Sequence, residues 1–364
     1  MPLTPPANSR PPSDAHRLPV DALASWLAAH VPGCEGGTVT VTKFRGGESN
    51  PTYWVGVEGA AGGDVELVLR KKPPGVLLPS AHAVDREYRV MRALAGTDVP
   101  VPEVLALCED DAVVGASFFV MRHVKGRIFW DPTVPELPTN EERRALYQDF
   151  VRVLVALHGV DVAKVGLGDF GKPGGYMPRQ VERWSKQYQA SRTADVPAME
   201  ALMAWLGSRT PETDETTLVH GDYRLDNLMW SPAEAGPPRA IATLDWELST
   251  LGHPLCDLAY ACMGYHLVLP GRGGLLGVDV GALGIPTESE LVDAYCQATG
   301  RARIADWPYF VAFGIFRLAA IAQGVYKRGL QGNASSEATA GFGAAVTFLS
   351  EIACGIAGVP TTPR

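Results

Sequence analysis

The first third of the chain alternates between hydrophobic and polar positions with a period of two. The segments that show this alternation lie at residues 39–41, 53–57, 65–69, 104–107 and 117–121. Because successive side chains of a β-strand point to opposite faces, the pattern predicts five strands. Apolar residues at helical spacing in residues 20–29 and 84–91 predict one helix before the first strand and another between the third and fourth strands.

After Pro138, apolar positions recur at helical spacing, which predicts a second, mainly helical region. Its first helix is expected over residues 139–158, because Thr139-Asn140-Glu141-Glu142 provides a cap and an acidic first turn. The other segments with this spacing are residues 179–189, 199–206, 255–263, 308–330 and 342–356. Residues 270–284 are rich in glycine and are expected to form a mobile loop near a substrate cleft.

These patterns divide the chain into an N-terminal lobe over residues 21–124 and a helical C-terminal lobe over residues 125–364. Residues 1–20 are rich in Pro, Ser and Arg and lack the hydrophobic segment of a signal peptide, so we expect a flexible tail. No apolar run is expected to be long enough to span a membrane. The expected location is therefore the cytoplasm, with no membrane partner.

Composition narrows the function classes. Hydrophobic residues make up 46% of the chain and charged residues 20%, as in an ordinary soluble globular protein. The net charge of −8 argues against generic nucleic-acid binding, which requires a basic face. The six cysteines are scattered without a C-x-x-C pair, which predicts free thiols in a reducing compartment rather than a zinc site or a disulfide framework.

Polar residues interrupt a set of short apolar runs in residues 218–247. The runs are Leu218-Val219, Leu228-Met229-Trp230 and Ala240 to Leu244. A Gly/Pro-rich turn region separates the last two runs, which are expected to pair as a hairpin. The hairpin would bring Asn227, at the entry to one strand, beside Asp245, at the exit of the other, with Asp222 on the loop just before them.

These polar residues suit one kind of chemistry. Asn227 and Asp245 offer hard oxygen ligands for Mg²⁺, and Asp222 can take the proton of an attacking hydroxyl, as phosphoryl transfer requires. Asp and Asn also commonly cap turns and helices. The spacing of Asp222 and Asn227, followed 18 residues later by Asp245, is more specific than such caps and favours a catalytic role. His220 is expected to brace the loop rather than to act as the base.

The motifs HGDYRLDN, TLDWE and HPLCDLAY resemble those of the aminoglycoside phosphotransferase family, whose relatives, the protein kinases, carry an HRD-x4-N loop and a DFG Asp at the corresponding places. The resemblance extends from about Phe44 to about Ala334. The segments LRKKPPG, SAHAVDREYRVM, RQVERWSKQY and FRLAAIAQGVYKRGLQGNA more narrowly resemble the branch found fused to acyl-CoA dehydrogenases in animals. The family implies an α+β, bilobal, protein-kinase-like fold, with a five-stranded antiparallel sheet and a helix in a small N-lobe and a larger helical C-lobe.

A glycine-containing turn between the first two strands can lay backbone N–H groups over nucleotide phosphates. This turn comprises Gly46, Gly47, Glu48, Ser49 and Asn50. At the end of the third strand, the family's phosphate-binding Lys position matches Arg70, which keeps the charge but differs in geometry. The resemblance implies Glu87 as its partner. Lys72 shares a strand face with Arg70, so either side chain could contact the phosphates.

The resemblance assigns two further groups of residues. The backbone carbonyl of Arg122 and the amide of Val124 are implied to bond the adenine edge at a hinge between the lobes. Asp257 matches a family aspartate that is expected to stabilise the catalytic loop.

Together these observations predict an ATP- and Mg²⁺-dependent kinase that acts on a small hydroxylated molecule. Arg317, Lys327 and Arg328 are candidate cleft residues with few acids nearby, which favours a neutral or anionic acceptor. The resembled branch suggests a hydroxy acid or its acyl-CoA thioester. An aminoglycoside-type antibiotic kinase and a catalytically weak nucleotide-binding pseudokinase, suggested by Arg70, stay open as alternatives. No protein partner is predicted.

Overall fold

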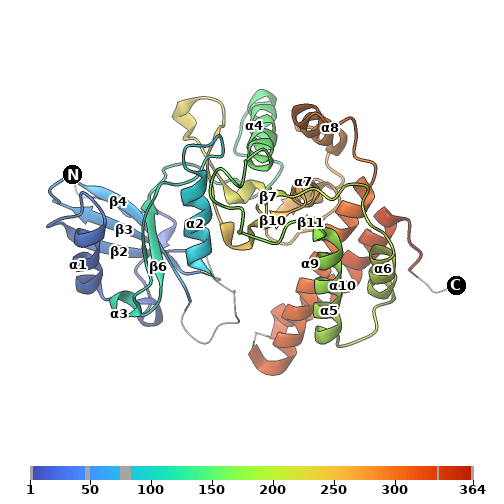
Figure 1. Cartoon of the computed structure of the whole chain (residues 1–364), viewed down its shortest axis with the longest axis horizontal. Helices are drawn as coiled ribbons and strands as arrows, with labels where there is room; N and C mark the ends of the chain where they lie inside the picture. Colours follow the sequence, from blue (N-terminus) through green and yellow to red (C-terminus); the bar gives the residue numbers. More distant parts are fainter. Residues whose placement is uncertain (1–2, 46–49, 74–82, 334–335, 362–364) are drawn as a thin grey trace. The chain divides into compact units, whose positions relative to one another are not determined.

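The computed structural model describes the chain apart from residues 1–2, 46–49, 74–82, 334–335 and 362–364, and apart from the side chains of residues 332–340. It forms two compact units (Figure 1). The first unit comprises residues 1–127, 228–236 and 240–249. The second unit comprises residues 128–227, 237–239 and 250–364. This corrects the predicted division at residue 124, because two segments of the central polar stretch belong to the first unit.

A six-stranded antiparallel sheet forms most of the first unit, in the order β1-β2-β3-β4-β6-β5. The strands are β1 (Ser9–Arg10), β2 (Thr38–Phe44), β3 (Thr52–Glu58), β4 (Val65–Lys71), β5 (Val104–Cys108) and β6 (Phe118–Arg122). Five of them confirm the prediction. The sixth, β1, corrects the expected flexible tail, because Ser9 pairs with Phe44 and Arg10 with Lys43. Backbone pairing at a sheet edge requires no hydrophobic alternation, so the sequence pattern did not predict this strand.

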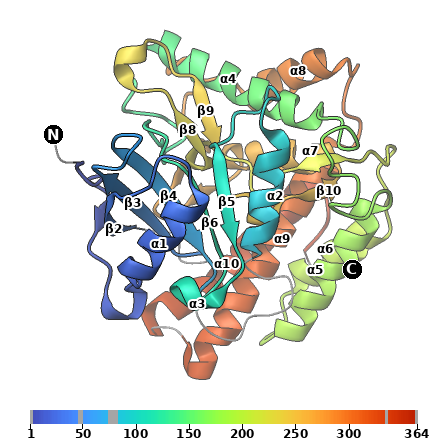
Figure 2. The ribbon, with the colours of Figure 1, turned by 60° about the vertical axis from the view of Figure 1, so that its left-hand side comes forward.

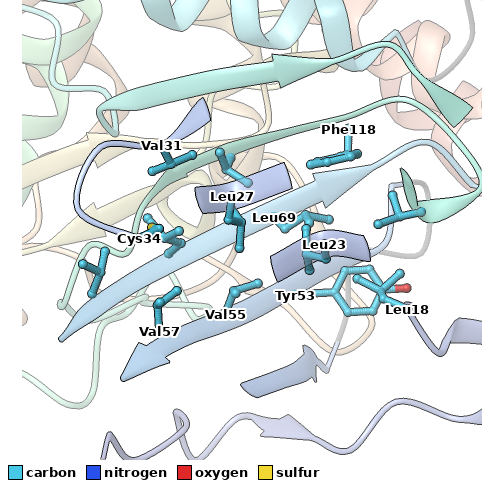
Figure 3. Close-up of a cluster of buried hydrophobic side chains, with 14 of the residues drawn as sticks. Leu18, Leu23, Leu27, Val31, Cys34, Tyr53, Val55, Val57, Leu69 and Phe118 are labelled. Atoms are coloured by element: carbon cyan, nitrogen blue, oxygen red, sulfur yellow. The ribbon is translucent and has the colours of Figure 1, made fainter. Parts of the chain in front are cut away.

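Helices cover both faces of the sheet. Helix α1 (Val20–His30) buries Leu23 and Leu27 against Tyr53 and Val55 of β3, as Figure 3 shows. Strand alternation puts Phe118 in this same cluster and sends Phe119 to the other face. There the Phe119 ring meets Tyr88 of α2 (Val84–Leu94), and α2 packs against β5 and β6. The short elements η1 (Asp14–His16) and α3 (Asp111–Val114) complete this part of the unit.

The predicted hairpin is present in the first unit. Strand β8 (Leu228–Trp230) pairs with β9 (Ala240–Thr243), with η3 (Ala233–Ala235) in the connection. Leu228 lies opposite Thr243, so β8 begins directly after Asn227 and β9 ends two residues before Asp245. Backbone hydrogen bonds between Arg127 and Trp230 tie β8 to the end of the first long segment, which explains why the hairpin belongs to this unit.

Eight helices are described in the second unit. They are α4 (Asn140–His158), α5 (Tyr176–Ser191), α6 (Pro197–Gly207), α7 (Pro254–Ala261), α8 (Glu288–Thr299), α9 (Trp307–Arg328), the π-helix η6 (Gly329–Asn333) and α10 (Ser336–Ala357). All but α8 and η6 were predicted. Thr139 and Glu142 close a capping box at the start of α4, as the sequence there suggests. Helices α9 and α10 lie side by side (Figure 2), and α5, α6 and α7 also pack on α9.

Short strands and turns connect these helices. In the second unit, strand β7 (Thr217–Val219) pairs with β10 (Thr250–Gly252). The 3-10 turn η2 (Leu225–Asn227) also belongs to the second unit, whereas the 3-10 turn η4 (Trp246–Leu248) belongs to the first unit. The predicted glycine-rich loop, residues 270–284, contains β12 (Gly273–Gly274) and a series of backbone-bonded turns. Strand β12 pairs with β11 (Val268–Leu269), which lies just before the loop and after η5 (Met263–Tyr265). That segment is therefore more ordered than the glycine content indicates.

Helix α9 lies in the core of the second unit. The prediction that no apolar run approaches membrane-spanning length is wrong by length and composition, since Trp307–Gln331 meets both criteria. However, 72% of its most apolar window is buried inside the protein. A helix that is apolar on all sides is expected when neighbouring helices surround it, and four helices pack on α9 here.

Candidate functional site

Arg70 is the centre of a buried charged cluster in the first unit. It stands near the end of β4, between Thr52 of β3 and Phe119 of β6. Its Nε lies 2.8 Å from Oε2 of Glu87 on α2, so the pairing that the family resemblance implied is present. Its Nη2 lies 2.5 Å from Oδ1 of Asp245. One guanidinium thereby joins the strand, the helix and the residue that follows the β8–β9 hairpin.

Two more residues join this cluster, and one of them was not predicted. Asn50 donates from Nδ2 to Oε1 of Glu87 at 2.8 Å and to Oε2 of Glu247 at 3.3 Å. Glu247 also lies 3.9 Å from Nη2 of Arg70. The Glu residue of the TLDWE motif was visible in the sequence, but only the turn η4 brings its side chain back toward Asn50. Within the described residues, Oδ1 of Asn50 is buried and accepts no hydrogen bond.

The cluster holds three carboxylates around a single guanidinium. Burial of Glu87, together with the negative charges of Asp245 and Glu247, raises the pKa of its carboxyl to about 7 although Arg70 opposes the shift. Burial alone would lower the pKa of Arg70, but the surrounding carboxylates raise it, so the guanidinium stays charged. Glu87, Asp245 and Glu247 therefore share the guanidinium of Arg70.

Asp245 has a left-handed backbone conformation, with φ of 62°. Asp and Asn adopt this conformation more readily than other residues with a side chain, because their short polar side chains can bond locally. The turn lies just after β9 and just before η4, and its side chain remains 30% exposed. One carboxylate oxygen is occupied by Arg70, and the other is available for a further ligand.

The remaining residues predicted in this unit stand as follows. Gly46, Gly47, Glu48 and Ser49 lie outside the described residues. Lys72 turns toward Asp85, 3.7 Å away, so Arg70 is the cation that pairs with Glu87. Among the described residues no hydrogen bond involves the amide of Val124, and the amide of Arg122 donates to the carbonyl of Glu103. The predicted hinge contacts of Arg122 and Val124 remain predictions.

In the second unit, Asn227 holds the predicted base. Its Nδ2 donates to the backbone carbonyl of Asp222 at 2.8 Å and to Oδ2 of the same residue at 2.9 Å. The turn η2 makes this possible, because it folds the five residues after Asp222 back on themselves. With its nitrogen used in this way, Asn227 keeps its amide oxygen for another partner. Arg224 adds an ion pair to Oδ2 of Asp222 at 3.2 Å.

Asp257 secures the loop that carries Asp222, which agrees with the expected structural role. It is buried on α7 and accepts the backbone N–H groups of His220 at 2.5 Å and Gly221 at 2.8 Å. Burial would raise the pKa of Asp257, but hydrogen bonds and charge from His158 and His220 lower it, so the carboxylate stays ionised. His220 in turn accepts the amide of Asp222 at its Nδ1, 3.3 Å away, which supports a bracing role for this histidine.

Two further residues contact the same loop, and the sequence did not single them out for this role. Arg317 of α9 donates from Nη2 to the carbonyl of Gly221 at 2.9 Å, and its guanidinium lies over the rings of Trp184 and Tyr260. Burial raises the pKa of the Tyr260 hydroxyl, and its interaction with Asp222 raises it further. Tyr260 is therefore a neutral hydroxyl that faces the predicted base.

Two of the three basic residues predicted to line a substrate cleft, Arg317 and Lys327, make other contacts. Arg317 braces the Gly221 turn, as described above. Lys327 donates to the backbone carbonyl of Ala190 at 2.6 Å, which caps the end of α5. Arg317 and Lys327 therefore give no support to an anionic acceptor.

The predicted Mg²⁺ ligands fit that ion chemically. Asn227 offers an amide oxygen, and Asp245 offers a carboxylate oxygen. Mg²⁺ binds oxygen and is usually held by one or two protein groups together with water and phosphate oxygens. Among the described residues, no group of three or more His, Cys, Asp or Glu side chains could hold a metal ion by itself. This donor set suits an ion that arrives with a nucleotide.

The first unit combines an antiparallel sheet with an ion pair between a strand and a helix, and the second unit carries an H-G-D-x4-N loop. These features define a phosphotransferase with a kinase-like fold. The family model described as "Phosphotransferase enzyme family" matches residues 40–308, and the chain belongs to that family.

Comparisons with known proteins place the chain within this family. It is 45% identical over 348 residues to acyl-CoA dehydrogenase family member 10 of Mus musculus, covering 95% of this chain but 32% of that protein. It therefore spans about a third of the length of that curated relative. A protein of Ralstonia eutropha JMP134, provisionally described as an aminoglycoside phosphotransferase, is 44% identical, with a TM-score of 0.83 over 94% of this chain and 100% of that one.

More distant structures share the fold alone. A thermostable mutant of the aminoglycoside phosphotransferase APH(4)-Ia, in complex with AMP-PNP and hygromycin B, is 15% identical with a TM-score of 0.56. The alignment covers 93% of this chain and 98% of that one. The predicted α+β, kinase-like fold is confirmed, with a six-stranded sheet in place of the predicted five-stranded one.

Proposed function

We propose that this protein transfers the γ-phosphoryl group of ATP, as its Mg²⁺ complex, to a hydroxyl group of a small molecule. The observation that supports this most directly is the arrangement of Asp222 and Asn227. One amide nitrogen fixes the carboxylate of Asp222, while the amide oxygen of the same residue is left for a cation. A structural turn would not require this division of one side chain between two roles.

In the proposed reaction, Asp222 orients the acceptor hydroxyl and takes its proton. A bond forms between the acceptor oxygen and the γ-phosphorus, the bond from that phosphorus to the bridging oxygen breaks, and ADP leaves. Mg²⁺, held by Asn227 and Asp245, would neutralise charge on the phosphate oxygens. Arg70 would turn part of its guanidinium from Asp245 toward the α- and β-phosphates, while Glu87 keeps its Nε in place.

The acceptor class is proposed to be a neutral or anionic hydroxylated metabolite, such as a hydroxy acid or a hydroxyacyl-CoA. The support is the 45% identity to a relative named as an acyl-CoA dehydrogenase family member. An aminoglycoside-type acceptor is the alternative, favoured by the description of the 44% identical protein. A nucleotide-binding role without turnover is also considered, because Arg70 replaces the family's Lys and is engaged by Asp245. We also propose that the protein is located in the cytoplasm and binds neither nucleic acid nor membranes.

The proposal is tested by thermal stabilisation with ATP, with and without Mg²⁺, on the wild type and on Asp245→Asn. Asn tolerates the left-handed backbone at this position, so the variant removes the charge without straining the turn. We expect a Mg²⁺-dependent shift of the melting temperature in the wild type that is largely lost in the variant. No shift with ATP and Mg²⁺ in the wild type would overturn the proposal.

Turnover is then measured as ADP release with hydroxy acids, their CoA thioesters and aminoglycosides. Asp222→Asn serves as the matched control, because Asn keeps the size of the side chain and removes the base. We expect this variant to bind ATP normally and to lose about 10²- to 10⁴-fold in turnover, the usual contribution of a positioned base. Normal turnover would displace Asp222 from its proposed role.

A further inference from the structure

A pocket with a volume of about 100 Å³ lies within the second unit, next to the loop that carries Asp222. Arg224, Leu225 and Asp226 of that loop form one wall. The rest of the lining is mostly apolar and includes Trp130, Phe150, Leu267, Leu269 and Leu275. Trp130 is 55% exposed, which is unusual for so large an apolar ring. An exposed aromatic ring at an apolar pocket provides contact area for a ligand.

Charged groups of alternating sign connect this pocket to Asp222. Asp222 pairs with Arg224 at 3.2 Å, and Arg224 pairs through Nε with Oδ1 of Asp226 at 3.3 Å. Asp226 then pairs through Oδ2 with Nη1 of Arg272 at 3.6 Å. Asp226 is buried, with a side chain 7% exposed, whereas the side chain of Arg272 is 40% exposed. The series therefore ends at the pocket in a cation that solvent and ligands can reach.

Arg272 is the most exposed member of this series. Arg224 is shared by two carboxylates, while the only charged partner of Arg272 among the described residues is Asp226, which it must share with Arg224. An exposed guanidinium carries five N–H donors, and one long ion pair leaves most of them available. Its backbone lies in the turn between β11 and β12, where its amide donates to the carbonyl of Leu269. The turn thus fixes the base of the side chain at the pocket wall.

We propose that Arg272 recognises an anionic group of the acceptor, and that it is a specificity-determining residue of this pocket. The inference rests on the proposed function and extends it to a particular acceptor chemistry, namely a hydroxyl group separated from a carboxylate or similar anion by an apolar segment. The hydroxyl would lie at Asp222, the apolar segment along Leu267, Leu269 and Leu275, and the anion at Arg272. A guanidinium binds carboxylate and phosphate oxygens in two parallel hydrogen bonds, which makes Arg suited to this task.

The same arrangement disfavours a polycationic acceptor. A polyamine-like antibiotic would place ammonium groups against Arg224 and Arg272, both of which line the pocket. Asp226 offers little compensation, because both arginines already engage it. Like charges forced together in a pocket of restricted volume reduce affinity, and such repulsion is a common means of selecting against a wrong ligand.

The test compares a straight-chain hydroxyhexanoate with its neutral methyl ester as acceptors for the wild type and Arg272→Gln. Arg303→Gln is the matched control, because Arg303 is exposed and lies outside the pocket. We expect kcat/KM of the wild type to favour the anion over the ester by roughly 10- to 100-fold, the range of a charged hydrogen bond. Arg272→Gln should remove this preference, and Arg303→Gln should retain it.

Equilibrium binding of the same two compounds, measured by calorimetry in the presence of ADP and Mg²⁺, separates this inference from the proposed function. If the anion binds more tightly than the ester and Arg272→Gln abolishes the difference, the anion site is supported even if no phosphate is transferred. If the wild type shows no preference for the anion, or Arg272→Gln keeps it, the assignment of Arg272 is overturned even if phosphate transfer occurs.

Discussion

At the scale of single residues, the charged cluster of the first unit places three carboxylates around Arg70. Arg70 serves Glu87, Asp245 and Glu247 at once, and Asn50 contributes hydrogen bonds but no charge. Glu87 is the most deeply buried of the three carboxylates, and its burial, together with the negative charges of Asp245 and Glu247, raises its pKa.

Glu87→Gln should change how stability depends on pH. The pKa of Glu87 in the folded protein, about 7, lies above the value of about 4.5 expected when it is unfolded. Its stabilising contribution is thus fully present below about pH 4.5 and is lost as the pH rises through 7. Glutamine keeps the hydrogen-bonding shape without titrating. The free energy of unfolding of the wild type, minus that of the variant, should fall across this window by an amount on the order of 3 kcal/mol.

The measurement is urea denaturation of both proteins between pH 4.5 and 7.5, the lower bound being the unperturbed pKa. Glu290→Gln is a suitable control, since Glu290 is an exposed carboxylate whose pKa is lowered by hydrogen bonds from Thr287. A difference between wild type and Glu87→Gln that stays constant over this range would show that Glu87 titrates normally.

At the scale of secondary-structure elements, short strands position the chemistry. Strand β8 starts directly after Asn227, β9 ends shortly before Asp245, and β7 leads into the Asp222 loop. Each of these strands is three or four residues long, so their stability must come from contacts outside the ladder. For β8 such a contact is the backbone pairing of Arg127 with Trp230.

Gly126→Ala should disturb this contact. A Cβ atom at Gly126 would lie 2.4 Å from the carbonyl oxygen of Trp230, and a backbone atom cannot move aside as a flexible side chain can. We expect a loss of about 1–3 kcal/mol in the free energy of unfolding, as is typical of overpacking. Gly168→Ala is the control, because no atom lies within 4 Å of the corresponding Cβ position. Equal denaturation midpoints for the two variants would show that β8 adjusts without cost.

The elements that the sequence revealed are those with a hydrophobic period. Strands β2 to β6 and helices α1, α4 and α9 bury one side or all sides, so their buried positions are apolar and can be recognised in the sequence. Strand β1 shows no apolar alternation in the sequence, because two residues at a sheet edge bury little surface. Helix α8 also escaped prediction, although its Thr287 and Glu290 form a capping box that could have identified it.

The candidate site was predictable to a similar extent. Asp222, Asn227 and Asp245 follow from spacing and family motif, and the pairing of Arg70 with Glu87 follows from the resemblance. Glu247, Tyr260 and Arg317 could not be assigned in this way, because their roles depend on where a turn or a distant helix directs a side chain. Arg272 lies in a glycine-rich segment where no periodicity constrains the backbone.

At the scale of the whole molecule, the described thiols are all shielded. The six cysteines are free, five are buried and Cys256 is partly accessible by residue area. Burial raises the pKa of each of these thiols, including Cys256. A protonated, buried thiol is a poor nucleophile, so the folded protein should resist thiol reagents.

We expect Ellman's reagent to label the native protein slowly and to titrate six thiols after unfolding in guanidinium chloride. The two measurements use the same sample, so each preparation is its own control. Rapid labelling of a thiol before denaturant is added would contradict the burial of these side chains, and fewer than six thiols in the unfolded chain would indicate oxidation.

The apolar character of α9 also has a consequence for how the protein is made. Three of the helices that pack on it, α5, α6 and α7, precede it along the chain, and only α10 follows. During translation, three of the four helices that pack on α9 have therefore left the ribosome before α9 itself emerges. Since exposed apolar segments attract chaperones and membranes, this order of synthesis shortens the interval in which the helix lacks partners.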